Sequence, residues 1–210
     1  KKSDPPVTSN AFPSANELTQ LQCERVALWH QQPIDNPFDG INKLICEQHA
    51  CNFQLWHKED VARSPHATAQ EIADVKRDID KLNQSRNDLI EKIDDEISKL
   101  LIEADVLQRK DAPINTETVG SVIDRLSIMA LRLYHYQEQL QRSNVDPTHH
   151  DEVTLRINLC EQQHSDLSLS LQDLLNDLFS GVKQHKTYRQ LKMYNDPTLN
   201  PAIYETGNGS

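Results

Sequence analysis

A single positive charge interrupts an otherwise apolar helical stripe near the middle of the chain. Arg86 falls at the centre of this stripe, because successive helical residues advance by about 100°. The apolar members of the stripe are Leu82, Leu89 and Ile93, and the polar residues along one edge are Asn83, Asn87 and Asp94. A buried charge is costly unless it is paired. Arg86 is therefore predicted to belong either to an ion pair between helices or to a binding site.

The preceding helical segment shows a matching break in its apolar face. Its polar residues are Asn52 and Glu59 in the middle of the face and His49, Asp60 and Arg63 toward the edge. These two patterns favour a pairing of Glu59 or Asp60 with Arg86, and a carboxylate can accept two hydrogen bonds from one guanidinium. The simplest interpretation is a buried ion pair that fixes the register of two neighbouring helices.

A later segment carries a second, mixed face in addition to its apolar seam. This face consists of Asp124, Ile128, Leu131 and His135. It indicates contact with a further layer of helices, with the C-terminal tail or with a ligand. A single histidine such as His135 is more often a structural residue with satisfied hydrogen bonds than a catalyst.

Acidic residues on the same two helices offer an alternative chemistry. They resemble the ligand sets of all-helical nucleoside triphosphate pyrophosphohydrolases, and they are Glu59, Asp60, Glu91 and Asp94. Mg²⁺ or Mn²⁺ would be the cofactor, because these ions take oxygen ligands and bridge substrate phosphates. Arg63 or Arg86 would then hold phosphate. The position of Glu91, away from the apolar seam, weighs against this hypothesis.

Other recognised chemistry finds little support. Helical pairs such as Glu161-x-x-His164 place two metal ligands on one face, but Glu161 lies off the apolar stripe that a di-iron bundle would need. The chain has no G-x-S-x-G, P-loop, G-x-G-x-x-G or H-E-x-x-H motif. Common hydrolases and classical nucleotide-binding proteins are therefore disfavoured.

Helix signals along the chain predict the elements that would position these residues. Ser14 with Glu17, and Thr68 with Glu71, form capping boxes. The predicted helices cover 14 to about 31, 37–63, 68–109, 116–142 and 148 to between 181 and 186, with Asn36 as a cap for the second and with Thr148 and Asp151 opening the fifth. Short loops join antiparallel neighbours. The predicted fold is all-α, an elongated antiparallel up-and-down bundle of four long helices and a shorter N-terminal helix.

The two ends of the chain are expected to differ from the helical domain at 14–187. Residues 1–13 contain three prolines and are predicted to be disordered or extended. Residues 188–204 are predicted to form an ordered, non-helical strap that packs back on the bundle, and 205–210 a flexible end. In a functional alternative, Tyr194, Asn195 and Asp196 cover one end of a pocket.

Composition limits the classes of partner. The 210-residue chain has a formal net charge of −10, so phosphate backbones are repelled and no nucleic-acid partner is expected. No segment reaches the roughly 18 to 20 apolar residues of a membrane span. Four cysteines without a C-x-x-C pair predict free thiols and a cytoplasmic location. Long helices offer faces large enough for a homo-oligomer.

Several segments together resemble a bacterial family known as domain of unknown function 4254. They are His49 to Arg63, with Leu55-Trp56-His57; Asp80 to Asp94, with Leu82-Asn83-Gln84-x-Arg86-Asn87-Asp88; Asp124-Arg125-Leu126-Ser127; Tyr134-His135; and the tail from Tyr188 to Pro201. The resemblance covers most of residues 18–204. Val61 and Leu191 depart from it without removing a candidate site residue. It implies no assigned activity, only an association with bacterial genes for envelope sugar transfer.

Three functional hypotheses follow from these observations. The first is a helical-bundle binding or scaffold protein whose polar cluster fixes helix register, with a protein partner or a second copy of itself. The second is a metal-dependent enzyme that acts on a small phosphorylated ligand. The third is a small-ligand binding protein that uses the same polar residues without catalysis and is linked to envelope sugar metabolism.

Overall fold

In the part of the chain that the structure describes, five helices account for almost all regular structure. The computed structural model describes residues 12–107, 109–191, 193 and 196–201. Its helices are α1 (Ala15–Trp29), α2 (Gly40–Ala62), α3 (Ala69–Glu103), α4 (Val119–Leu140) and α5 (Pro147–Phe179). The described residues form no named strand, and Ile114 and Gln184 make an isolated bridge. The predicted all-α fold is confirmed.

Local capping explains where several helices begin. The predicted capping boxes at Ser14 and Thr68 are both present and open α1 and α3. The start of α2 differs from the prediction, because the helix begins at Gly40 and Asp39 is its N-cap. The side chain of Asn36 instead accepts a hydrogen bond from the backbone N–H of Phe38. The fifth helix opens on Asp146 rather than on the predicted Thr148, with the Asp146 side chain accepting from the Thr148 backbone.

The ends of α3 and α5 follow the Schellman pattern. At the end of α3 the backbone N–H of Val106 bonds the carbonyl of Leu101 at 3.0 Å, with Asp105 at φ 51°. This closes α3 about six residues earlier than predicted, because an aspartate tolerates the left-handed conformation that ends a helix. At the end of α5 the same arrangement uses Gly181 at φ 72°, close to the predicted end.

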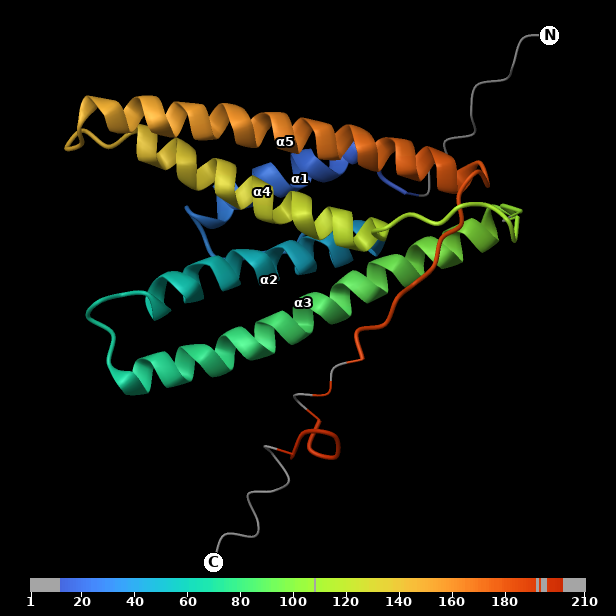
Figure 1. The fold of residues 1–210 in the computed structure, drawn as a ribbon, viewed down its shortest axis with the longest axis horizontal. Coiled ribbons are helices and arrows are strands. Elements are labelled where there is room, and N and C mark those ends of the chain that lie inside the picture. Colours follow the sequence, from blue (N-terminus) through green and yellow to red (C-terminus); the bar gives the residue numbers. More distant parts are fainter. Residues whose placement is uncertain (1–11, 108, 192, 194–195, 202–210) are drawn as a thin grey trace, which may run out of the picture.

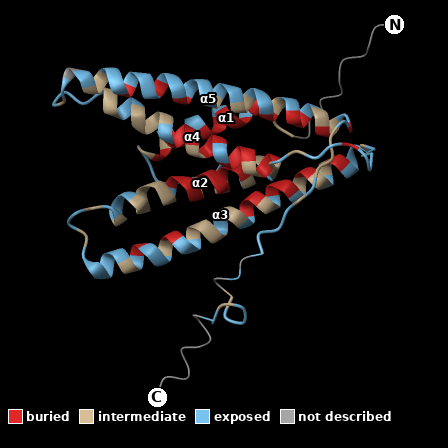
Figure 2. Ribbon diagram, in the orientation of Figure 1, coloured by how far each residue is buried: buried red, intermediate tan, exposed pale blue. Residues whose placement is uncertain are grey.

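The helices pack as two antiparallel hairpins with α1 between them. α2 packs along α3, α4 packs along α5, and α1 lies mainly against α4 (Figure 1). The hairpins converge where the second half of α3 meets the start of α4. Buried residues gather at this end and in the middle of α2, whereas the first half of α3 is largely exposed (Figure 2). The core is therefore concentrated where the hairpins meet.

A glycine allows the two hairpins to approach closely. A Cβ atom placed on Gly120 of α4 would lie 2.6 Å from the backbone carbonyl oxygen of Ile90 and 3.0 Å from a carboxylate oxygen of Asp94. The backbone N–H of Gly120 donates to that Asp94 oxygen at 2.8 Å. A side chain at this position would push α4 away from α3 and break the bond.

The chain after α5 crosses back over α3, as Figure 1 shows. Gln184 bonds the backbone before α4, and the ring of His185 bonds the backbone carbonyl of Asp94. Arg189 then pairs with Glu91 and Asp95 on α3. The tail is held by these polar contacts, whereas Tyr188 and Met193, predicted to pack on the bundle, are more than half exposed.

None of the helices in the described ranges is both long enough and apolar enough to cross a membrane.

Candidate functional site

A directed chain of hydrogen bonds crosses the core from α4 through α2 to α1. The Asn52 amide donates to Ser127 Oγ at 2.9 Å, and Ser127 Oγ lies 2.6 Å from His49 Nδ1. His49 Nε2 lies 3.0 Å from the backbone carbonyl oxygen of Gln22. Because a carbonyl oxygen can only accept, His49 carries its proton on Nε2, and its Nδ1 accepts from Ser127.

Burial keeps His49 neutral. Its side chain is fully buried, and burial lowers its pKa from an ordinary value near 6.5 to about 3. The uncharged ring fits its two hydrogen bonds, in which Nε2 donates and Nδ1 accepts. If Nδ1 were also protonated, the hydroxyl of Ser127 would lose its acceptor. His49 therefore links α1, α2 and α4 through two fixed hydrogen bonds.

Asp124 on α4 is the centre of a second set of bonds that joins this chain. Arg86 on α3 donates to it with two nitrogens, one of them Nε at 2.7 Å. The amides of Gln48 and Asn52 on α2 donate to the same carboxylate. The side chain of Asp124 is only 7% exposed, and that of Arg86 is 25% exposed. Hydrogen bonding to Asp124 raises the pKa of Arg86 above its ordinary value.

The prediction that α2 supplies the partner of Arg86 is therefore wrong. We expected Glu59 or Asp60 of α2, but the guanidinium pairs with Asp124, 38 residues further along the chain. Glu59 instead pairs with Arg63 one turn later, at 2.8 Å, and its side chain is 43% exposed. The patterns within α2 and α3 do not indicate that α4 crosses close enough to α3 to supply a buried carboxylate.

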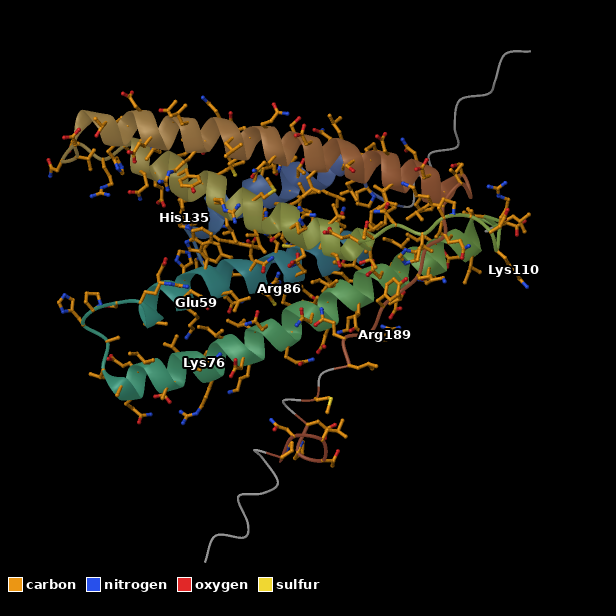
Figure 3. The ribbon with its side chains drawn as sticks, viewed as in Figure 1. Glu59, Lys76, Arg86, Lys110, His135 and Arg189 are labelled. Atoms are coloured by element: carbon orange, nitrogen blue, oxygen red, sulfur yellow. The ribbon has the colours of Figure 1, made fainter. Side chains whose placement is uncertain are left out.

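A cleft of about 510 Å³ lies beside this network, between α2, α3 and α4. Its apolar wall consists of Leu55, Trp56, Ile128 and Leu131. Its polar wall consists of Asn52, Glu59, Asp60, Arg63, Asn83 and Arg86. All six polar residues were candidates from the sequence, and Figure 3 marks Glu59 and Arg86 in the region where these helices face one another.

The charges on the cleft wall are largely matched in pairs. Arg63 is paired with Glu59 and Arg86 with Asp124. Within the described residues, no hydrogen bond or ion pair engages the side chains of Asp60 and Asn83. The cleft thus offers a free carboxylate and a free amide but no unpaired arginine.

The remaining candidates lie away from the cleft. Glu91 is bonded by Arg189 and by the backbone of Gln190, whose side chain also reaches Asn87. Asp94 is buried against Gly120, and burial raises its pKa. His135 stacks on Trp56, with ring centroids 4.6 Å apart, and pairs with Glu138.

The predicted carboxylate ligands do not meet. Glu59 and Asp60 line the cleft, but Glu91 and Asp94 are engaged by the tail and by α4. Nowhere among the described residues do three carboxylates offer ligand atoms to one point. Of the tail candidates, Tyr194 and Asn195 lie outside the described residues, and Asp196 bonds Thr198 within its own turn.

Residues 42–187 match the family described as Protein of unknown function (DUF4254). The chain belongs to this family. The match confirms the resemblance seen in the sequence. No curated protein and no solved structure matches the chain.

The matched part of this DUF4254 protein contains the Asp124 network and the whole cleft wall. Gln22 and the rest of α1 precede the match, so the α1 end of the His49 chain lies outside it.

Sequence reasoning missed two buried members of the network, Gln48 and Ser127. Both residues carry a signal in the sequence. Gln48 lies one helical turn before Asn52, and Ser127 lies three residues after Asp124, so each shares a helix face with a recognised candidate. A polar residue that repeats at this spacing along an apolar face indicates a network rather than a single pair.

Proposed function

We propose that this chain is a binding protein that holds a small, neutral, polyhydroxylated molecule such as a sugar in the α2–α3–α4 cleft. The observation that carries the proposal is the composition of the cleft wall. Leu55 and Trp56 provide apolar surface, while the unengaged side chains of Asp60 and Asn83 provide hydrogen-bonding groups. A sugar has the matching character, with C–H faces and hydroxyl groups that both donate and accept.

The buried network supports this function by holding the cleft wall in place. Asn52 and Arg86 line the cleft and are themselves bonded to Asp124. Side chains fixed in advance lose less conformational entropy when a ligand binds. The ion-pair network therefore holds in position two of the side chains that would contact the ligand.

Charge balance favours a neutral ligand over a phosphorylated one. A phosphate group requires cations that are free to pair with it. Both arginines of the cleft are already paired with carboxylates, and Asp60 adds a further negative charge. The pyrophosphohydrolase-like alternative also needs four carboxylates that converge on a metal ion. Those four carboxylates do not converge at the cleft. Binding without catalysis is the function that these contacts support.

Thermal unfolding in the presence of sugars tests the proposal. Neutral hexoses and disaccharides are compared with their phosphorylated counterparts. At ten times its Kd a ligand stabilises the folded chain by about 1.4 kcal/mol, which raises the Tm of a domain of this size by roughly 3 to 5 °C. We expect a neutral sugar to give this rise and its phosphate to give less.

Variants of the cleft make the test specific. Asn83→Leu should abolish the rise in Tm, because it removes an unengaged polar group from the wall, and Asp60→Asn should reduce the rise, because it replaces a charged acceptor with a weaker amide. Asp80→Asn, which removes a charge from α3 outside the cleft, is the matched control and should keep the rise. Stabilisation by the phosphates alone, or by no member of the panel, would contradict the proposal.

We further propose that the chain forms a homodimer through α5, works in the cytoplasm and has no nucleic-acid partner. Leu155, Leu159 and Leu169 share one face of α5 and are 69%, 59% and 66% exposed. All four cysteines are free thiols, which suits a reducing compartment. The net charge of −10 opposes binding to nucleic acid.

Sedimentation equilibrium tests the dimer. The wild type is expected at twice the chain mass, and Leu159→Lys is expected at the mass of one chain, because a charge would be buried in the interface. Ile72→Lys changes an exposed apolar residue of α3 and should leave the dimer intact. A wild type that sediments as a monomer at all concentrations would exclude this assembly.

A further inference from the structure

Three histidines from three separate helical elements lie close together, and the ring of one of them, His135, stacks on Trp56. His30 is the C-cap of α1, His57 lies on α2 and His135 lies on α4. Each offers one ring nitrogen, and the three nitrogens lie within 4.8 Å of one another. Among the described residues this is the one group of three or more potential metal ligands.

The hydrogen bonds of two of these rings determine which nitrogen is free. His30 Nδ1 lies 2.7 Å from the backbone carbonyl oxygen of Val26, and His135 Nδ1 lies 2.8 Å from a carboxylate oxygen of Glu138. Both oxygens accept, so each Nδ1 carries the proton and each Nε2 carries a lone pair. Both Nε2 atoms are buried and have no hydrogen-bond partner.

A buried lone pair without a partner is costly, and two in one cluster indicate a missing occupant. Metal-bound histidines characteristically donate the second ring N–H to a backbone carbonyl or a carboxylate. The Val26 carbonyl and the Glu138 carboxylate are these two kinds of partner. The outer contacts of a metal site are therefore already in place around the cluster.

Aromatic side chains hold the rings in their orientations. His30 stacks on Tyr134, with centroids 4.0 Å apart, and His135 stacks on Trp56 at an interplanar angle of 7°. Phe53 packs edge-on against His30 and His57. An apolar wall of this kind limits water access and strengthens metal–ligand electrostatics.

We propose that His30, His57 and His135 form a binding site for one late first-row transition-metal ion, of which Zn²⁺ fits best. Three imidazoles and no thiolate suit zinc, copper or nickel rather than magnesium or calcium. Around a tetrahedral zinc the ligand nitrogens are roughly 3.3 Å apart, so the rings need to close by about 1.5 Å at most. Three protein ligands leave a fourth position for water or a small ligand.

Zinc titration of the full chain, stripped of metal with a chelator, tests the site. We expect one Zn²⁺ per chain in competition with a chromophoric chelator. His57→Gln and His135→Gln should weaken the affinity at least about 100-fold, and Glu138→Gln should weaken it about 10-fold or more by freeing the His135 ring. His66→Gln alters an exposed histidine outside the cluster and should leave the affinity unchanged.

Cobalt as a spectroscopic probe tests the ligand set in the unaltered protein. Co²⁺ should give the intense visible bands of a tetrahedral site without the near-ultraviolet charge-transfer band of a thiolate. Circular dichroism confirms that each variant is folded, and Glu138→Gln changes a residue whose side chain is 45% exposed. No bound Zn²⁺, a bound Zn²⁺ that His57→Gln does not weaken, or a thiolate band would each overturn the proposal. Sugar binding is measured separately, so the two proposals can fail independently.

Discussion

Replacing Asp124 with asparagine is expected to lower the free energy of unfolding by about 3 kcal/mol. The variant keeps the shape of the side chain but removes the charge that pairs with Arg86. Removing one partner of a buried ion pair leaves the other charge uncompensated, which costs about 3 to 5 kcal/mol. We take the lower end because Arg86 is a quarter exposed and water screens part of its charge. Urea unfolding followed by circular dichroism measures the change.

Two further variants separate this network from the pairing that the sequence favoured. Glu59→Gln should cost only about 0.3 to 0.5 kcal/mol, because Glu59 and Arg63 form a half-exposed pair one helical turn apart. Changing Asp124 to leucine together with Arg86 and Gln48 to methionine should recover much of the lost stability, since apolar replacements often match a buried ion pair and the Gln48 amide would otherwise lose its acceptor. Equal losses for Glu59→Gln and Asp124→Asn would contradict the network described above.

Acidification is expected to destabilise the folded chain through His49. Burial lowers the pKa of His49 to about 3, whereas the same ring in the unfolded chain titrates near 6.5. Below pH 6.5 the unfolded chain therefore binds a proton that the folded chain does not, and stability falls as the pH falls. The slope is about 1.4 kcal/mol per pH unit, so this residue accounts for roughly 3 kcal/mol between pH 6.5 and pH 4.

Comparison with His49→Gln isolates this contribution from other titrating groups. Glutamine can still hydrogen-bond within the site but takes up no proton, so the variant should show a shallower loss of stability over the same pH range. His66→Gln, at an exposed position between α2 and α3, should follow the wild-type curve. Parallel curves for the wild type and His49→Gln would show that the ring is protonated in the folded chain.

The residues of the cleft were largely visible in the sequence because helix periodicity places them. Asn52, Glu59, Asn83 and Arg86 interrupt apolar faces, and a polar residue on an apolar face must find a partner or line a cavity. The periodicity does not tell which helix supplies the partner. Arg86 meets Asp124 because α4 crosses α2 and α3, and this crossing depends on a close contact at Gly120.

The histidine cluster is even harder to predict from the sequence than the Arg86 pairing. His30, His57 and His135 share no spacing motif, since they lie on three elements. The spacing of His135 and Glu138 along one helix is visible in the sequence, but this carboxylate orients the ring and does not complete a ligand set. Only the positions of the other two elements bring three rings to one point.

The sequence by itself determined the order of the helices and several of their ends, because the signals act over three or four residues. Capping boxes at Ser14 and Thr68 and the end at Gly181 are satisfied by neighbouring backbone, and the structure places them as predicted. The tertiary structure alone decided which polar groups meet, as with Asp124 and Arg86 or with the three histidines. Those contacts join residues far apart in the chain, and their geometry follows from how whole helices cross and pack, which no local pattern records.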